Sequence, residues 1–315
     1  MKMRNPNNTQ QVTEFILIGF QLPRPMEVLL FTVLLFVFLL TLTGNITIIT
    51  LVCLDQRLQT PMYFFLCNLS NLEILFVFSI TPKILVNLLS RNKSISFLGC
   101  AAQCYFYFFL GTTEFILIAV MSFDRYVAIC HPLRYTVIMD DRVCIFFVLG
   151  CWVGGFLSTI FPIIRLFQLS FCGSNAIDHF FCDYAPMIKL SCNDVHVLMA
   201  LVSILSSVVL LLSLSVTVAS YLYILVTILH MHSTTGQKKA FSTCAAHIMV
   251  ASIFYGSAIF MYSLPGQGRS QDVQKAVAVL TAVVTPLLNP FIYSLRNKKV
   301  KEAFRDCVKR KRFPQ

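Results

Sequence analysis

The chain has 315 residues, of which 57% are hydrophobic and 12% are charged, and its formal net charge at pH 7 is +11. The surface of a soluble protein of this size needs more charged side chains than that, so the composition excludes a soluble protein and indicates one that lies in lipid. The positive charge fits a membrane-topology pattern better than a nucleic-acid footprint, and we expect no nucleic-acid partner.

Residues 1–26 precede the first long apolar stretch. The first 20 lack the basic start, apolar run and small-residue cleavage site of a signal peptide, so we expect the first spanning helix to act as an uncleaved insertion signal. Asn7 lies in an Asn-x-Thr acceptor within a free terminus, whereas the similar acceptor at Asn92 is close to the bilayer. We therefore predict an extracellular N-terminus that is glycosylated at Asn7.

Seven long stretches that are poor in charged residues follow one another along the chain. Each reaches roughly the 20 residues that a helix needs to cross the hydrocarbon core, and a helix satisfies its own backbone polar groups there. The stretches cover residues 28–54, 62–81, 98–123, 143–164, 197–228, 240–264 and 276–295. We expect an all-α membrane protein, in which residues 27–295 form one seven-transmembrane helix bundle.

Glu73 and Glu114 lie in the apolar middle of the second and third stretches. Ionisable groups at that depth are costly and are by default functional. Two neighbouring carboxylates cannot both stay charged without a cation, so such a pair shares a proton or binds a cation. An equally good explanation is a single protonated glutamic acid that is hydrogen-bonded within the bundle.

The longest connection, residues 165–194, contains Cys172, Cys182 and Cys192. Topology places it on the oxidising outer side, near Cys100 at the start of the third stretch. Four cysteines allow three pairings, and spacing alone does not choose among them.

Lysine and arginine residues set the expected orientation, because they stay preferentially on the cytoplasmic side. With an outer N-terminus, 15 of the 25 basic residues fall on the inner side, nine of them in residues 296–315. This cytoplasmic tail places Val300, Ala303, Phe304 and Val308 on one stripe of a helix. We expect a short amphipathic helix that lies on membrane lipid of the inner leaflet, in a multi-pass protein of the plasma membrane.

Two motifs stand at the inner ends of spanning stretches, DRY at residues 124–126 and NPFIY at 289–293. Longer strings accompany them: PMYFFL (61–66), MSFDRYVAICHPLRY (121–135), SY (220–221), KAFSTC (239–244) and PLLNP (286–290). Over nearly the whole chain, these strings resemble the odorant receptors, a family of rhodopsin-like G-protein-coupled receptors. Departures from the commonest wording, such as SF at 122–123, remove no charge on which the family's switch depends.

The resemblance implies an activation switch in which the arginine is held at rest by its acidic neighbour and then turns toward a G protein. Arginine is always charged, so a helix end must hold it with a carboxylate or carbonyl. A simple snorkelling arginine is the structural alternative. The residues that match the switch are Asp124, Arg125, Tyr126, Tyr221, Asn289, Pro290 and Tyr293.

The resemblance also implies the cysteine pairing, Cys100 with Cys182 and Cys172 with Cys192. In the superfamily, the positions of Glu73, Glu114 and Asn289 surround a sodium ion, and we expect no other cofactor. His179 and Asp183 flank Cys182, but that disulfide leaves too few ligands for a closed metal site.

A ligand pocket is expected in the outer half of the bundle, between the third, fifth, sixth and seventh spanning helices. Helical periodicity and the matching family positions place there mostly apolar side chains and a few hydroxyls, which suit a small neutral molecule. The predicted lining residues are Cys104, Phe108, Gly111, Thr112, Leu205, Ser206, Val209, Tyr255, Ala258, Ile259, Tyr262, Val279 and Ala282.

The expected function is therefore that of an odorant receptor for small volatile ligands, which activates the heterotrimeric stimulatory G protein of olfactory neurons and raises cyclic AMP. A transporter or channel is less well supported, because the chain shows no paired halves or repeated glycine-proline breaks. A membrane enzyme is also disfavoured, because no spanning stretch carries a nucleophile elbow, a His-Glu-x-x-His or a paired-aspartate motif.

Overall fold

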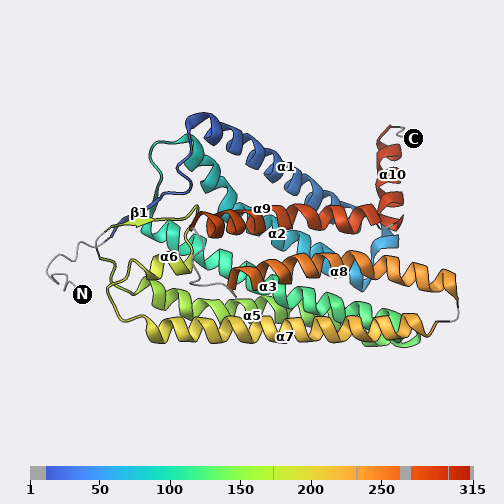
Figure 1. Cartoon of the computed structure of the whole chain (residues 1–315). Coiled ribbons are helices and arrows are strands. Elements are labelled where there is room, and N and C mark those ends of the chain that lie inside the picture. The colour runs from blue at the N-terminus through green and yellow to red at the C-terminus, as the bar shows by residue number, and fades with distance from the viewer. Residues whose placement is uncertain (1–11, 173, 232, 263–270, 297, 313–315) are drawn as a thin grey trace.

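The computed structural model describes residues 12–172, 174–231, 233–262, 271–296 and 298–312. Seven long helices run side by side along its length (Figure 1). They are α1 (Arg24–Leu54), α2 (Pro61–Leu89), α3 (Phe97–Cys130), α5 (Asp141–Phe167), α7 (His196–Leu229), α8 (Thr234–Tyr262) and α9 (Gln271–Arg296). The predicted seven-helix bundle is confirmed.

Six of these helices are individually long and apolar enough to cross a membrane. In α8 the apolar part among the described residues is shorter, His247–Phe260. Most helices extend beyond the predicted apolar stretches, because polar turns continue a helix past the hydrocarbon layer. Local signals fix the ends: Ser96 Oγ accepts a hydrogen bond from Gly99 N–H (3.1 Å) at the start of α3, and Asp140 caps α5 in the same way through Val143 N–H (2.8 Å).

Helix α3 is central and packs against α2, α5, α7 and α8. Its buried side chains, such as Leu110 and Leu117, join apolar clusters with neighbouring helices. Large apolar side chains on the outer helices, including Phe36, Phe146 and Leu212, point outward and are exposed. A bundle that is apolar on its outside is expected where lipid is the solvent.

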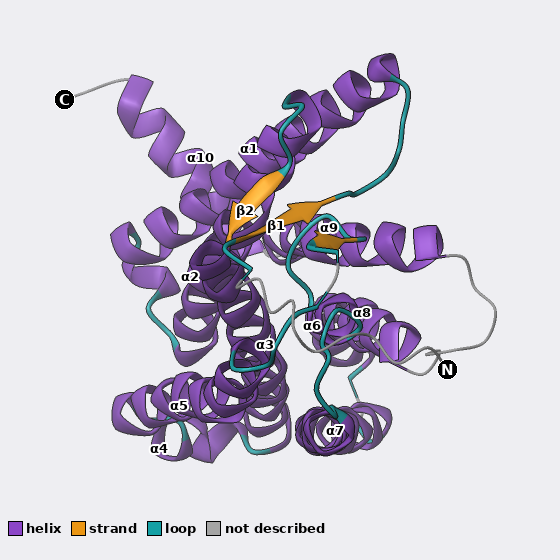
Figure 2. Ribbon diagram, turned by 90° about the vertical axis from the view of Figure 1, so that its left-hand side faces the viewer, coloured by secondary structure: helices purple, strands orange, loops and turns teal. Residues whose placement is uncertain are grey.

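A small three-stranded sheet lies at one end of the bundle (Figure 2). Strand β1 (Glu14–Leu17) pairs antiparallel with β2 (Ser94–Ser96) and parallel with β3 (Ala176–Ile177). The sequence did not predict this sheet, although its central strand comes from an apolar run in the N-terminal segment. Both disulfides also lie at this end, which we call the disulfide end.

Four short elements lie in the connections: η1 (Gln56–Leu58), η2 (Pro132–Arg134), α4 (Tyr135–Ile138) and α6 (Tyr184–Ile188). The last helix, α10 (Lys298–Arg312), lies at the end opposite the disulfide end and turns away from the bundle axis (Figure 1). Val300 and Ala303 are buried against the bundle, whereas Phe304 is 51% exposed. The predicted amphipathic helix is therefore present. One part of its apolar stripe packs against the bundle, and another part is exposed.

Candidate functional site

A cavity of about 100 Å³ lies between α2, α3, α8 and α9. On α3 its lining lies between Tyr107 and Phe115, in the half of the helix nearer the disulfide end. Five aromatic side chains and one carboxyl group give it a largely apolar wall with one strongly polar member. The lining residues are Phe76, Tyr107, Phe108, Gly111, Thr112, Glu114, Phe115, Phe254, Ser257, Ala258, Thr281, Thr285 and Pro286.

Four of the predicted lining residues border this cavity, namely Phe108, Gly111, Thr112 and Ala258. The three predicted members from α7, Leu205, Ser206 and Val209, do not line it. The side of the cavity that was expected from α7 is formed by α2. Helix α7 packs chiefly against α3, α8 and α5.

The other predicted lining residues have different surroundings. Cys104 is buried in the apolar cluster around the Cys100–Cys182 bond, and Val279 and Ala282 pack in a cluster with α2. Ile259 is 41% exposed, so its expected inward position is wrong in this structure. The side chain of Tyr262 lies outside those that the structure describes.

Tyr255 is buried one turn away from Ala258 and points toward α7. Its hydroxyl lies 3.2 Å from that of Thr217, and its ring centroid lies 5.6 Å from that of Phe115, which lines the cavity. Tyr255 therefore contacts the cavity wall without forming part of it. It links the wall to the interface between α7 and α8.

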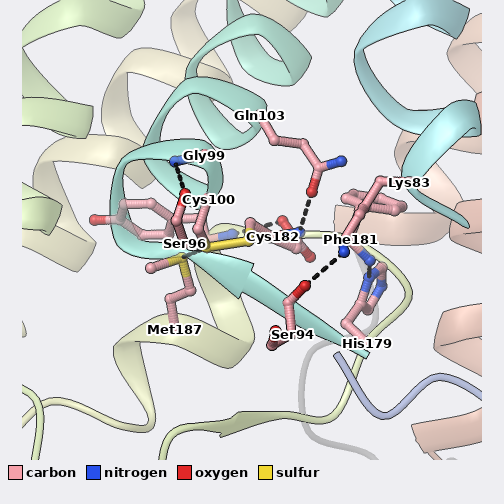
Figure 3. Close-up of a disulfide and its surroundings, with 12 residues drawn as sticks. Lys83, Ser94, Ser96, Gly99, Cys100, Gln103, His179, Phe181, Cys182 and Met187 are labelled. Carbon is pink, nitrogen blue, oxygen red and sulfur yellow. Dashed lines mark hydrogen bonds between the residues drawn. A yellow bond between two sulfur atoms is a disulfide. The ribbon is translucent and has the colours of Figure 1, made fainter. Parts of the chain in front are cut away.

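Figure 3 shows the connection between α5 and α7 joined to the start of α3 by the Cys100–Cys182 bond. The disulfides Cys100–Cys182 and Cys172–Cys192 are both present, as the resemblance implied. Gln103 on α3 accepts a hydrogen bond from Cys182 N–H (3.0 Å). It also donates one to the carbonyl of Ser79 on α2 (3.1 Å). The loop is thus fixed to two helices beside the first disulfide.

Phe181 is the side chain of this loop that reaches toward the cavity. It is fully buried, and its ring centroid lies 4.8 Å from that of the lining residue Tyr107 and 4.4 Å from the His179 ring. Burial lowers the pKa of His179 and raises the pKa of Asp183. The His179 and Phe181 rings meet edge to face, so this part of the loop packs on Tyr107 as an aromatic cluster.

An ion pair ties α9 to the same loop. The buried Lys275 ammonium group contacts the Asp178 carboxylate and also donates to the carbonyl of Gly19 (3.3 Å). Gly19 has a φ of +64°, and a Cβ there would meet the Phe180 ring at 3.0 Å, so the close approach requires glycine. The N-terminal segment, the loop and α9 therefore meet in one closed surface.

A buried polar core lies next to the cavity. Asn289 Nδ2 donates to Glu73 Oε1, and Asn45 lies beside the same glutamate. Among the described residues, Glu73 Oε2, Asn45 Oδ1 and Glu114 Oε1 have no hydrogen-bond partner. Such oxygens fit a hard cation or a shared proton. The resemblance implied that Glu73 lies beside Asn289, and the two are hydrogen-bonded; the sequence did not predict that Glu114 borders the cavity.

A charged cluster lies at the opposite end of α3. The buried Arg125 guanidinium pairs with the Asp124 carboxylate, and the Tyr135 hydroxyl donates to Asp124 Oδ1 (2.8 Å). Burial, and after it the charge of Asp124, raises the pKa of Tyr135 well above its ordinary value, so the hydroxyl remains a donor. Tyr221 on α7 is partly buried and packs against the apolar cluster of Ile224, Ile228 and Cys244. The arginine is thus held by its neighbour and does not simply reach toward the lipid surface.

The other predicted switch residues have mixed surroundings. The Tyr126 hydroxyl lies 3.1 Å from His131 Nε2 and faces away from the ion pair. Pro290 is buried where α9 crosses α1, and a Cβ on Gly44 would meet its ring at 3.1 Å. The side chain of Tyr293 and the whole of Asn7 lie outside the described part of the chain. Their roles stay predictions.

Three contributors were missed by sequence reasoning. Gln103 is a polar residue in an apolar helix, a signal that could have indicated its clamp on the loop. Tyr135 is the last residue of the sequence string 121–135, which was interpreted only as a family motif. Phe181 gave no signal, because which of several loop aromatics turns inward depends on the tertiary fold.

Seven spanning helices, an internal cavity and a held arginine at the far helix end together define a seven-helix membrane receptor. Residues 34–311 match the sequence family described as Olfactory receptor. The chain is 54% identical to human Olfactory receptor 6J1 over 95% of its own length and 86% of that protein. It is 50% identical to human Olfactory receptor 6S1 (96% and 92% covered) and 52% identical to mouse Olfactory receptor 6E1 (96% of each).

The chain belongs to the olfactory receptor family. It is accordingly a G-protein-coupled receptor for odorants and not an enzyme, and it is a multi-pass membrane protein.

Proposed function

We propose that this receptor binds small, mostly apolar volatile molecules in the cavity between α2, α3, α8 and α9. The observation that carries this proposal is the cavity itself, which is lined largely by aromatic side chains, one of which contacts Phe181 of the loop. Dispersion contacts with one or two hydrogen bonds would hold a small volatile molecule there. The residues predicted on α7 do not line this cavity. They would contact a ligand only if the ligand displaces side chains that form the cavity wall.

Binding would activate the stimulatory G protein of olfactory neurons and raise cyclic AMP. Arg125, held by Asp124 and Tyr135, is the expected coupling residue, with Tyr221 as its partner on α7. Beside this cluster, Leu133 is 96% exposed and Val137 is 76% exposed. Exposed apolar side chains next to a charged switch favour a protein-docking surface at this end.

Two independent features support the proposed orientation. Disulfides persist in oxidising compartments, and both lie at the end that also carries β1. The basic tail lies at the other end, where Lys299, Lys301 and Arg305 are exposed around α10. The N-terminus would therefore be extracellular and the C-terminus cytoplasmic in the plasma membrane, with α10 against anionic lipid.

The polar core would hold a sodium ion or a shared proton between Glu73, Glu114 and Asn289. A bound cation would neutralise the acid pair and favour the arrangement of helices that holds it. Glu114→Gln is expected to change basal activity or its dependence on sodium concentration. A variant that matches the parent in both would contradict a role for the acid pair.

The experiment that tests the function is a screen of a chemically diverse odorant panel in cells with a cyclic AMP reporter, with ion flux recorded in parallel. We expect ligand-dependent cyclic AMP at a subset of odorants and no ligand-gated current carried by the receptor itself. A current that needs no G protein would identify a channel and contradict the proposal.

A further inference from the structure

Glu114 has an unusual position for a buried acid. It is 3% exposed and lines the cavity, and its Oε1 has no hydrogen-bond partner among the described residues. The nearby amide of Asn289 donates to Glu73 and not to Glu114. A buried carboxyl group without a hydrogen-bond donor costs free energy, so the Glu114 side chain favours a donor that enters the cavity.

Two other hydroxyls of the lining direct their donors to their own helices, and both keep acceptor lone pairs. The Ser257 hydroxyl donates to the carbonyl of Phe254 (2.9 Å), and the Thr281 hydroxyl donates to the carbonyl of Val277 (2.8 Å). Both hydroxyls are thus engaged by their own helices. The carboxyl group of Glu114 accepts a hydrogen bond whether it is ionised or protonated, because each form keeps acceptor lone pairs.

We infer that Glu114 is a specificity-determining residue that accepts a hydrogen bond from the ligand, and that this receptor prefers small aromatic molecules bearing a hydroxyl group. The inference rests on the proposed function and names its ligand class. A cavity of about 150 Å³ in another protein holds benzene, so this cavity of about 100 Å³ limits the ligand to one ring and has to widen to admit it. The surrounding rings of Phe76, Phe108 and Phe115 favour an aromatic body.

A role for Glu114 in ligand binding is compatible with one in the polar core. A carboxyl group has two oxygens, so one can face the polar core while the other faces the cavity. The ligand's hydroxyl and the polar core would then meet at the same side chain. A bound ligand would then contact the same carboxyl group whose charge a cation or a shared proton must neutralise.

Benzyl alcohol and anisole provide a matched test, because they are isomers and only benzyl alcohol has a hydroxyl donor. Their potencies would be measured in the parent receptor, in Glu114→Gln, which keeps an acceptor oxygen, and in Glu114→Leu, which has none. The ratio of the two potencies within each variant cancels differences in surface expression and in coupling. We expect benzyl alcohol to be about tenfold or more the stronger ligand in the parent, the effect of pairing one buried acceptor.

The preference should persist in Glu114→Gln and disappear in Glu114→Leu. An equal potency of the isomers in the parent, an unchanged ratio in Glu114→Leu, or a response to other odorants but to neither isomer would each overturn the inference.

The same ratio can be measured as thermal stabilisation of the purified full-length receptor, without a G protein. Stabilisation with the expected preference, but no cyclic AMP response in cells, would contradict the proposed coupling and leave the inference standing. Stabilisation by neither isomer would overturn the inference, whatever the outcome of the odorant screen.

Discussion

At the residue scale, the charged cluster on α3 shows how a membrane protein holds a permanent charge. Arg125 is only 7% exposed, and its permanent charge is compensated by the Asp124 carboxylate and the hydroxyl of Tyr135. An arginine at this position without partners would be strongly destabilising. The Asp124–Arg125 ion pair is thus required for stability. An activating movement of Arg125 must break its interactions.

Tyr135→Phe removes one hydroxyl from this cluster and leaves the ring in place. The Asp124 carboxylate loses a donor at 2.8 Å, so the Asp124–Arg125 pair is held less firmly. We expect severalfold higher cyclic AMP without ligand, measured against surface density. Basal activity equal to that of the parent would show that the hydroxyl does not restrain the switch.

Gly111→Leu tests the cavity directly. A Cβ at Gly111 meets nothing closer than Phe76 Cε2 at 3.8 Å, so the backbone has room and the rest of the leucine would enter the cavity. We expect responses to active odorants to weaken by about tenfold or more, while surface expression survives. Gly150→Leu is the matched control, because a Cβ there meets nothing within 4 Å. Full odorant potencies in Gly111→Leu would place the binding site elsewhere.

At the scale of the elements, the sequence predicted all seven spanning helices, because charge-poor stretches of that length have few alternatives in lipid. It did not predict β1–β3, since strands of two to four residues form only where tertiary contacts align them. Helical periodicity placed Phe108, Gly111 and Thr112 on one face correctly. It could not rank the neighbours of that face, so α7 was expected where α2 stands.

The contact between α3 and α5 depends on one glycine. A Cβ on Gly155 would overlap with Thr113 Oγ1 and would meet the Phe109 carbonyl oxygen at 3.1 Å. We expect Gly155→Ala to destabilise the bundle by about 1–3 kcal/mol, because the helices must separate to admit a methyl group. Gly150→Ala on the same helix should have no such effect. Equal melting temperatures of the two purified variants would contradict this packing.

At the scale of the whole molecule, the disulfide end is a closed surface and the opposite end is a charged one. The cysteine pairing could be predicted only through the resemblance, because the spacing allowed three pairings. The Lys275–Asp178 pair and the packing of Phe181 on Tyr107 could not be predicted at all, since both depend on how the loop folds back over α3 and α9.

Loss of the second disulfide should impair folding of this closed surface. The Cys172–Cys192 bond closes a loop with a sequence separation of 20, and its removal is expected to cost on the order of 2 to 5 kcal/mol. Cys172→Ser and Cys192→Ser should therefore reduce the amount of receptor at the cell surface. Cys53→Ser, at a free and exposed cysteine, is the control. Normal surface levels and signalling in both loop variants would show that the bond is dispensable.

The most direct test of receptor function compares odorant-evoked cyclic AMP in the parent, Arg125→Ala and Arg142→Ala at equal surface density. Arg125 is buried in the charged cluster, whereas Arg142 is exposed at the start of α5. We expect the parent and Arg142→Ala to respond alike to odorants that the panel identifies. Arg125→Ala should reach the surface and give no response. Odorant-evoked cyclic AMP of normal size in Arg125→Ala would contradict the proposed coupling of the odorant cavity to a G protein through this helix end.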